Sequence, residues 1–196
     1  ADQIARITFD SPSTSNAITY AMMLQYIDAL ESARKDDARF LIIDAEGADF
    51  TLGRDQKEKV PGLAREDSLR LILRANAALR AFEGVSIALI QGQALGFGSG
   101  IALHSTISIA TQSATFGFDE INHGLAPLVI VAYAPYFLAP RVVQELVITG
   151  RKLSAAEARE IGIASRVVSD DALQATADAV IADIGERLPS AVRLVR

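Results

Sequence analysis

The sequence predicts an α/β fold whose parallel strands are buried on both faces. Short apolar runs of strand-like composition alternate along the chain with longer stretches of helical periodicity, and this alternation is typical of α/β proteins. The apolar runs are nearly continuous, as expected for strands that are covered on both sides. Half of the 196 residues are hydrophobic, which is enough to bury a large core, and we expect one domain over residues 1–196.

The first quarter of the chain predicts two strands separated by a helix. Ile4–Phe9 alternates apolar and polar residues, as a half-buried strand does. Residues 11–16 are rich in turn formers and indicate a loop. Apolar side chains recur at helical spacing over Thr19–Lys35, which predicts an amphipathic helix. The short apolar run Phe40–Ala45 then predicts a buried strand.

A second strand–helix alternation follows in the middle of the chain. Phe50–Pro61 is polar and irregular, whereas Asp67–Phe82 has its apolar residues on one side and predicts a helix. Val85–Ile90 reads as a strand that enters a glycine-rich turn. A helix from this turn to Ser105 and a strand over Ile107–Ala110 complete the alternation.

The last third of the chain predicts mainly helices, and the sequence contains no internal repeat. Ser154-Ala155-Ala156-Glu157 has the pattern of a capping box, so a helix begins there. Gly150 ends the helix before it. In order, we expect a loop at 116–127, helices at 129–138 and 141–148, the capped helix after 154, a strand at 163–168 and a helix at 171–186.

Composition excludes several classes of function. The chain has no cysteine and only two histidines, His104 and His123, so a disulfide framework, a thiolate nucleophile and a Cys- or multi-His metal site are all excluded. The net charge of −5 and the lack of a dense Lys/Arg cluster argue against nucleic-acid binding. Residues 84–118 carry no charged side chain, but glycines and polar residues interrupt them, so we expect no membrane span. No signal peptide is visible, and the expected location is cytoplasmic.

The glycine-rich turn after Val85–Ile90 is the most informative segment. Glycines permit positive φ and close backbone approach, and a helix N-terminus offers free N–H groups. Gly96, Gly98 and Gly100 do not form the dinucleotide-binding pattern, and no Gly-Lys-Ser/Thr of a phosphate loop is present. The residues around Ser99 do not form a nucleophile elbow. An oxyanion hole built from backbone N–H groups and a plain tight turn remain as alternatives.

Further segments accompany this turn in a particular order, and together they identify a family. The segments are NAI at 16–18, FTLGRD at 50–55, GQALGFG at 92–98, FGFDEINHGLAP at 116–127, LVITGRKLSAAEA at 146–158 and GIA at 162–164. In this order and spacing, over nearly the whole chain, the sequence resembles the enoyl-CoA hydratase/isomerase (crotonase) superfamily.

The resemblance implies a crotonase-like spiral of repeated ββα units, a fold shared with the Clp-type serine proteases. It also implies that the thioester oxygen of an acyl-CoA lies between two backbone N–H groups, at the positions of Arg54 and Phe97. Backbone donors do not depend on the side chain, so an oxyanion hole can form although both residues are unusual there. The ring of Phe97 replaces a glycine and could narrow the acyl pocket. The side chain of Arg54 or Lys57 could meet the CoA phosphates.

The same resemblance assigns the proton-transfer group. Hydratases of the family use two glutamates, and the second matches Glu120, whereas the first matches Gly100. Two carboxylates suit addition of water, and a single one suits a proton shuttle. The sequence therefore predicts a 3,2-enoyl-CoA isomerase with Glu120 as its base. A hydratase or another lyase of the family, or a degenerate member that only binds acyl-CoA, remain as alternatives, and a Clp-type hydrolase is a more distant one.

The remaining implications concern binding and assembly. The acyl-CoA is the substrate, with no cofactor and no metal, and the expected assembly is a homotrimer or a dimer of trimers. The C-terminal helices that are usual in the family are short or missing from the sequence. Residues 128–133 are bulky and apolar where a glycine-rich run is usual, so we expect a bulkier pocket wall. The expected substrate- and CoA-binding residues are Asn16, Ala17, Asp55, Gly96, Gly98, Gly100, Pro127 and Leu128.

Overall fold

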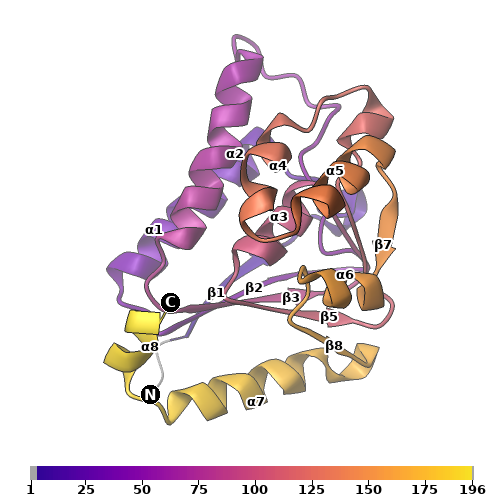
Figure 1. The fold of residues 1–196 in the computed structure, drawn as a ribbon. Coiled ribbons are helices and arrows are strands. Elements are labelled where there is room, and N and C mark those ends of the chain that lie inside the picture. The colour runs from indigo at the N-terminus through magenta and orange to yellow at the C-terminus, as the bar shows by residue number, and fades with distance from the viewer. Residues whose placement is uncertain (1–3, 196) are drawn as a thin grey trace.

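A five-stranded parallel sheet forms the centre of the computed structural model, which describes residues 4–195 (Figure 1). The strand order is β1-β2-β3-β5-β8, and all four neighbouring pairs run parallel. This arrangement confirms the expected α/β class with a parallel sheet. The strands are β1 (Ile4–Phe9), β2 (Phe40–Ala45), β3 (Val85–Ile90), β5 (Ile107–Thr111) and β8 (Arg166–Val168).

A smaller sheet beside the first contains three short strands. These are β4 (Gln93–Leu95), β6 (Thr115–Gly117) and β7 (Lys152–Ser154), with β4 parallel and β7 antiparallel to β6. Thr51 extends this sheet through a parallel bridge to Ala94. Each strand of the large sheet from β2 to β5 is thus followed by a strand or bridge of the small sheet and then by a helix. This is the repeated ββα unit that the family resemblance implied, although its copies share no sequence repeat.

The helices cover the two faces of the large sheet unequally. In Figure 1, α7 lies below the sheet and α1 to α6 lie on the other side; Val192 of α8 packs against the cluster on the α7 side. The helices are α1 (Tyr20–Lys35), α2 (Arg65–Arg80), α3 (Phe97–His104), α4 (Leu128–Tyr133), α5 (Pro140–Thr149), α6 (Ala155–Ile161), α7 (Leu173–Gly185) and α8 (Pro189–Val195), with short 3-10 turns η1 (Pro12–Thr14), η2 (Glu120–His123), η3 (Ala134–Tyr136) and η4 (Asp170–Ala172).

The alternation of side chains along each strand produces two hydrophobic clusters. In β2, Phe40 and Ile42 point to the α7 side, and Leu41 and Ile43 point into the larger cluster below α1 to α6. Strands with apolar residues on both faces require helices on both faces, because either exposed face would leave a large apolar surface in water. The larger cluster also contains the residues around the glycine-rich turn, and the functional site described below lies on that side.

Most expected elements are confirmed, with differences that have local causes. The predicted helix over 129–138 is divided into α4 and η3, and Pro135 lies within η3. The predicted strand over 163–168 begins only at Arg166. The N–H groups of Ile163 and Ala164 both donate to the carbonyl of Ala158, so these residues close the end of α6 instead of pairing in the sheet. The capping box is confirmed, since Ser154 and Glu157 bond each other's backbone N–H groups.

Among residues 4–195, no helix is both long and apolar enough to cross a membrane. This agrees with the interpretation of the uncharged residues 84–118, which form β3, β4, α3, β5 and β6. Gly92 and Gly96, which have positive φ, mark the turns before β4 and α3, whereas Gly98 and Gly100 lie within α3.

Candidate active site

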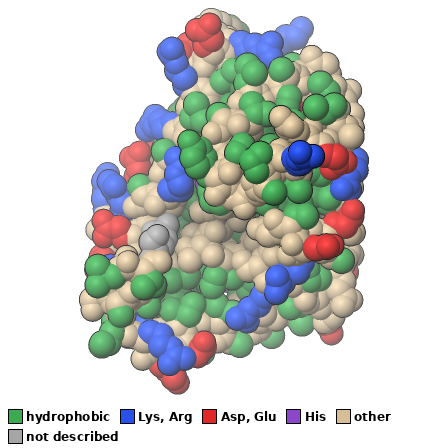
Figure 2. All heavy atoms as spheres, viewed as in Figure 1, with side chains coloured by type: hydrophobic (Ala, Val, Ile, Leu, Met, Phe, Trp, Pro, Cys, Tyr) green, Lys and Arg blue, Asp and Glu red, His purple; other side chains and the backbone are tan. Residues whose placement is uncertain are grey.

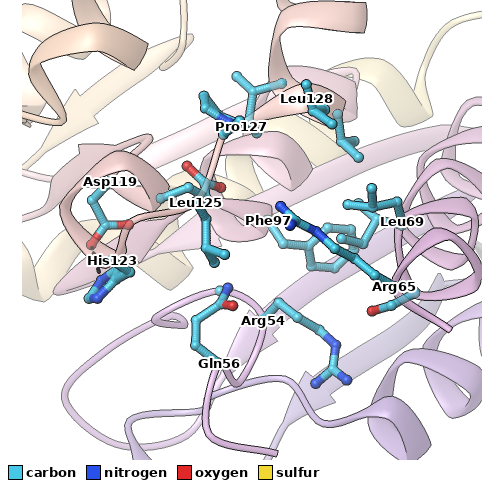
Figure 3. A pocket seen from close by; sticks show the side chains of 18 of the residues that line it. Arg54, Gln56, Arg65, Leu69, Phe97, Asp119, His123, Leu125, Pro127 and Leu128 are labelled. Atoms are coloured by element: carbon cyan, nitrogen blue, oxygen red, sulfur yellow. Dashed lines mark hydrogen bonds and ion pairs between the residues drawn. The ribbon is translucent and has the colours of Figure 1, made fainter. Parts of the chain in front are cut away.

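A cavity of about 280 Å³ opens above the glycine-rich turn, and most of its lining is apolar. Figure 3 shows the lining residues arriving from separate parts of the chain: Arg54 and Gln56 from one loop, Leu69 from α2, and Asp119 from the segment that leads into η2. A cavity with apolar walls and a few convergent polar groups is the usual form of a small-molecule site. The lining residues are Leu52, Gly53, Arg54, Gln56, Arg65, Ser68, Leu69, Ile72, Gly96, Phe97, Asp119, Glu120, His123, Leu125, Ala126, Pro127, Leu128, Val129, Ile130 and Tyr133.

Two residues that line this cavity have free backbone N–H groups. Phe97 is the first residue of α3, so its N–H has no partner within the helix. Arg54 forms a parallel bridge with Ile18, in which Ile18 and Asp55 supply the hydrogen bonds and the N–H of Arg54 faces the other way. Within the described residues, neither N–H makes a hydrogen bond. Two free donors at a helix start and an adjacent loop are the elements of an oxyanion hole.

Glycine at position 53 brings these two donors together. Gly53 has a φ of +82°, and a Cβ there would lie 2.7 Å from the carbonyl oxygen of Leu95 and 3.3 Å from the nitrogen of Phe97. The loop therefore packs directly on the backbone of the glycine-rich turn, which no residue with a side chain would allow. This contact explains why FTLGRD and GQALGFG occur in one sequence.

The carboxylate of Glu120 lies beside the same turn. A Cβ on Gly96, whose φ is +50°, would lie 2.9 Å from Oε1 of Glu120. The Oε2 atom is buried and has no hydrogen-bond partner. Burial raises the pKa of Glu120, with the neighbouring Asp119 charge adding to the effect, while the backbone N–H of Glu120 itself and the His123 side chain act in the opposite direction. A carboxyl of raised pKa next to a cavity is suited to act as a general base and acid near neutral pH.

Hydrogen bonds between distant segments fix the position of Glu120. The Ser99 hydroxyl donates to the carbonyl of Ala94 (2.7 Å) and accepts from the N–H of Gly117 (3.1 Å), which joins β6 to the start of α3. Beyond β6, Asn122 donates to the carbonyl of Gly150 (2.8 Å) and holds η2 against the end of α5. Ser99 is thus a structural residue, because both hydrogen bonds of its buried hydroxyl are made to backbone groups of Ala94 and Gly117.

Two side chains of the predicted site point to other partners. The guanidinium of Arg54 forms an ion pair with Glu58 (2.6 Å) and donates to the carbonyl of Ile18 (2.8 Å), so it is already engaged within its own loop. The ring of Phe97 is buried and packs edge-on against Tyr26 of α1, with ring centroids 5.9 Å apart. The ring is therefore placed in the core, and it forms the inner wall of the cavity.

The other predicted binding residues divide into two groups. Gly96, Pro127 and Leu128 line the cavity. Asn16 is fully buried, and its amide bonds the backbone of Ser11, Glu46 and Asp49, so it holds the loop together. The remaining four positions (Ala17, Asp55, Gly98 and Gly100) also lie outside the lining; a Cβ on Gly98 would lie 2.7 Å from Thr51, and Gly100 lies below Tyr133.

Sequence reasoning missed one wall of the cavity. Arg65, Ser68, Leu69 and Ile72 all come from the first two turns of α2, where the periodicity indicated only an amphipathic helix with an apolar side. Leu69 and Ile72 are half-buried rather than fully buried. A stripe of half-buried apolar residues at one end of a helix is the available signal, but it does not distinguish a cavity wall from the edge of the core.

Residues 1–196 match the family model described as enoyl-CoA hydratase/isomerase. The chain is 33% identical over 175 residues to the enoyl-CoA hydratase EchA19 of Mycobacterium tuberculosis, and the match covers 84% of this chain. It is 32% identical over 177 residues to 4-chlorobenzoyl coenzyme A dehalogenase-2 of an Arthrobacter species, with 86% of this chain covered. The chain spans 64% of the length of both relatives.

Solved structures show the same fold. A crystal structure of an enoyl-CoA hydratase/isomerase from Xanthobacter autotrophicus superimposes with a TM-score of 0.91 at 27% sequence identity, covering all of this chain and 74% of that chain. The crotonase-like architecture expected from the sequence is therefore confirmed.

Proposed function

This chain belongs to the enoyl-CoA hydratase/isomerase family, and from that premise we propose that it is an acyl-CoA enzyme that stabilises a thioester enolate. The reaction we assign first is the 3,2-isomerisation of an enoyl-CoA, with Glu120 as the single proton shuttle. The observation that carries this assignment is the pairing of one buried carboxylate with two free backbone N–H groups in one cavity.

The proposed step moves a double bond by one carbon. Glu120 removes a proton from C2 of a 3-enoyl thioester, and the electron pair moves onto the thioester oxygen. The N–H groups of Arg54 and Phe97 stabilise this oxyanion, each by roughly 3–4 kcal/mol in comparable sites. The protonated Glu120 then returns the proton at C4, and the double bond forms between C2 and C3. No carboxylate stands at position 100, so one residue performs both transfers.

Two other functions remain candidates within the family. One is another reaction that passes through the same enolate, and the dehalogenase named above is a family relative whose name describes a different reaction. The other is a member that binds acyl-CoA without catalysis, for which Gly100 in place of a glutamate is the supporting feature. The raised pKa of Glu120 favours the catalytic interpretation, because a buried carboxylate without a partner lowers stability and has no evident structural role.

We also propose that copies of this chain associate, as a homotrimer or a dimer of trimers. Figure 2 shows hydrophobic side chains gathered on the surface in the region of α4 and α5 and in that of α8. Tyr136, Ile148 and Leu194 are exposed to 86%, 71% and 87%. Apolar surface of this kind favours contact with another protein. Light scattering of the purified chain measures the assembly, and a monomer at micromolar concentration would contradict it. The cytoplasmic location stays a prediction.

The assay that tests the proposed function follows 3-hexenoyl-CoA in the ultraviolet as the conjugated 2-enoyl thioester forms. We expect the wild-type protein to turn over and Glu120→Gln to lose about 10²- to 10⁴-fold in kcat. Glu145→Gln is the matched control, because Glu145 is exposed and paired with Arg151 at 2.8 Å. No turnover by the wild-type protein would reject the isomerase, and a titration with acyl-CoA would then separate a binding protein from an enzyme with another substrate.

A further inference from the structure

Tyr133 lies against the residue that matches the first glutamate of the family's hydratases. That glutamate corresponds to Gly100, on α3. A Cβ built on Gly100 would lie 2.6 Å from the hydroxyl oxygen of Tyr133 and 3.6 Å from its Cζ atom. A side chain at position 100 and the phenol of Tyr133 therefore exclude each other. The glycine does not leave an empty place, because a hydroxyl from α4 fills it.

The ring of Tyr133 is held firmly along one face of α3. It packs on His104, with ring centroids 4.6 Å apart, and His104 lies one helical turn beyond Gly100. Phe137 packs edge-on against both rings. The Nδ1 atom of His104 lies 3.3 Å from the guanidinium of Arg80, and burial together with the Arg80 charge lowers the pKa of His104 to about 3. A neutral, packed histidine thus supports the ring whose hydroxyl lies over Gly100.

The Tyr133 hydroxyl has the properties of a group that awaits a ligand. The side chain is only 6% exposed, it lines the same cavity as Glu120, and no residue between 4 and 195 bonds its hydroxyl. Burial, with the charge of Glu120 in second place, raises the pKa of this phenol, so it stays protonated and can donate. Two polar groups without partners in a mostly apolar cavity are the arrangement that binds a water molecule or a ligand oxygen between them.

We propose that Tyr133 is a positioning residue for the hydration reaction of the family, and that its hydroxyl holds the water molecule that adds to a 2-enoyl thioester. The inference rests on the proposed function, because it uses Glu120 as the base and the N–H groups of Arg54 and Phe97 as the oxyanion hole. The co-substrate is water and the substrate class is a conjugated enoyl-CoA. Tyr133 supplies a hydrogen bond and keeps its own proton.

The atoms of the proposed step balance with one carboxylate. Glu120 takes a proton from the water while the water oxygen forms a bond to C3. The electron pair of the double bond moves to the thioester oxygen, where the two N–H groups hold it. The protonated Glu120 then gives its proton to C2, and a 3-hydroxyacyl thioester results. A second carboxylate is unnecessary, because the function of holding the water passes to the phenol.

The test measures isomerisation and hydration in the wild-type protein and in a variant that lacks only the Tyr133 hydroxyl. Wild-type protein and Tyr133→Phe are each given 3-hexenoyl-CoA and 2-hexenoyl-CoA, and products are separated by liquid chromatography and mass spectrometry. We expect both reactions in the wild type. In Tyr133→Phe we expect kcat for hydration to fall by about 10²-fold relative to kcat for isomerisation, because isomerisation needs no water. The phenylalanine keeps the ring that packs on His104, and retained isomerisation shows that the variant is folded.

Tyr26→Phe is the matched control. Its hydroxyl is also buried without a partner, but Tyr26 lies behind the ring of Phe97 and does not line the cavity, so both activities should stay unchanged. Isomerisation without hydration in the wild type would overturn the inference and leave the proposed function intact. Equal loss of both reactions in Tyr133→Phe, or loss of neither, would also overturn it by indicating a structural role. Absence of both reactions from the wild type would reject the proposed function itself.

Discussion

The two faces of the five-stranded sheet satisfy their buried polar groups differently. On the α7 face the polar side chains are paired: the Asp44 carboxylate of β2 accepts hydrogen bonds from Arg6 and Thr8 of β1. Four buried polar atoms have no hydrogen-bond partner in the described part of the chain, and all belong to the opposite side: Tyr26 Oη in α1, Asn76 Nδ2 in α2, His104 Nε2 in α3 and Glu120 Oε2 in η2.

This difference separates the parts of the molecule that provide stability from those that provide chemistry. A buried polar atom without a partner costs roughly 1–3 kcal/mol, so the α1 to α6 side gives up stability that the α7 side keeps. The same side contains the cavity, the two free N–H groups and the Glu120 carboxylate. Nearby buried polar residues that hold the loops in place do have hydrogen-bond partners. Both side-chain polar atoms of Asn16 and the hydroxyl of Ser99 bond the backbone. Of the four unpartnered atoms in the described residues, only Glu120 Oε2 belongs to a residue that lines the cavity, so the lack of partners characterises the whole α1 to α6 side.

The largest expected effect concerns the apolar face. Ile181→Ala in α7 should lower the free energy of unfolding by about 3 kcal/mol, because the side chain is 6% exposed and its removal leaves a cavity against the sheet. The kcat for isomerisation at a temperature where the variant is folded should not change. Urea titration and the ultraviolet assay measure the two quantities. A fall in kcat without a loss of stability would break the distinction between the two faces.

On the cavity side we expect a smaller effect, on kcat instead of on the free energy of unfolding. Gly96→Ala places a methyl group 2.9 Å from Oε1 of Glu120, at a φ of +50°, so the carboxylate must move from the oxyanion turn. We expect kcat to fall by about 10²-fold, as displacements of about 1 Å do in other enzymes. Gly162→Ala is the control for a glycine of positive φ, since its φ is +94° and nothing lies within 4 Å of the new methyl group. If the two variants lost the same activity, backbone strain and not the position of Glu120 would be the cause.

The smallest effect is a pH dependence of stability. The pKa of Glu120 is raised in the folded protein, so the folded state holds this proton more tightly than the unfolded chain does. The free energy of unfolding therefore falls as pH rises from 4.5, the ordinary pKa of the group, to the pKa in the folded state. Glu120→Gln should therefore be more stable than the wild type at neutral pH, and the gain should vanish below about pH 4. Urea titrations at several pH values measure this. A variant less stable than the wild type at pH 7 would show that the carboxylate has a stabilising partner.

The large sheet and most helices could be predicted from sequence because their signals are local. Five apolar residues in β2 or in β3, or apolar spacing over four turns in α1, suffice for an assignment. The strands β4, β6 and β7 have three residues each, too few for alternation to be recognised, and they were missed. They form because neighbouring segments pair with one another; just after β4, for example, the N–H of Gly96 donates to the carbonyl of Gly117 in β6 (2.8 Å).

The site residues that lie in sequence motifs were predicted, whereas those that join the site only through tertiary packing were missed. Glu120, Arg54 and Phe97 were named from segments whose residues match the family, and the structure places all three around one cavity. Tyr133 falls within residues 128–133, which were expected to form a bulky pocket wall, but its position against Gly100 had no such signal. Its contact with Gly100 joins residues 33 positions apart through the packing of α4 on α3, and neither the periodicity nor the composition of either helix contains that information.

The most direct test of the central claim, that Glu120 both removes and returns the proton, is the fate of deuterium in a single turnover. With enzyme in excess over 3-hexenoyl-CoA that carries deuterium at C2, the account predicts that part of the label is found at C4 of the 2-enoyl product, by mass spectrometry or nuclear magnetic resonance. It also predicts that Glu120→Gln forms almost no product in the same time. Product formed at the wild-type rate with all of the removed label lost to water would contradict a single-carboxylate shuttle.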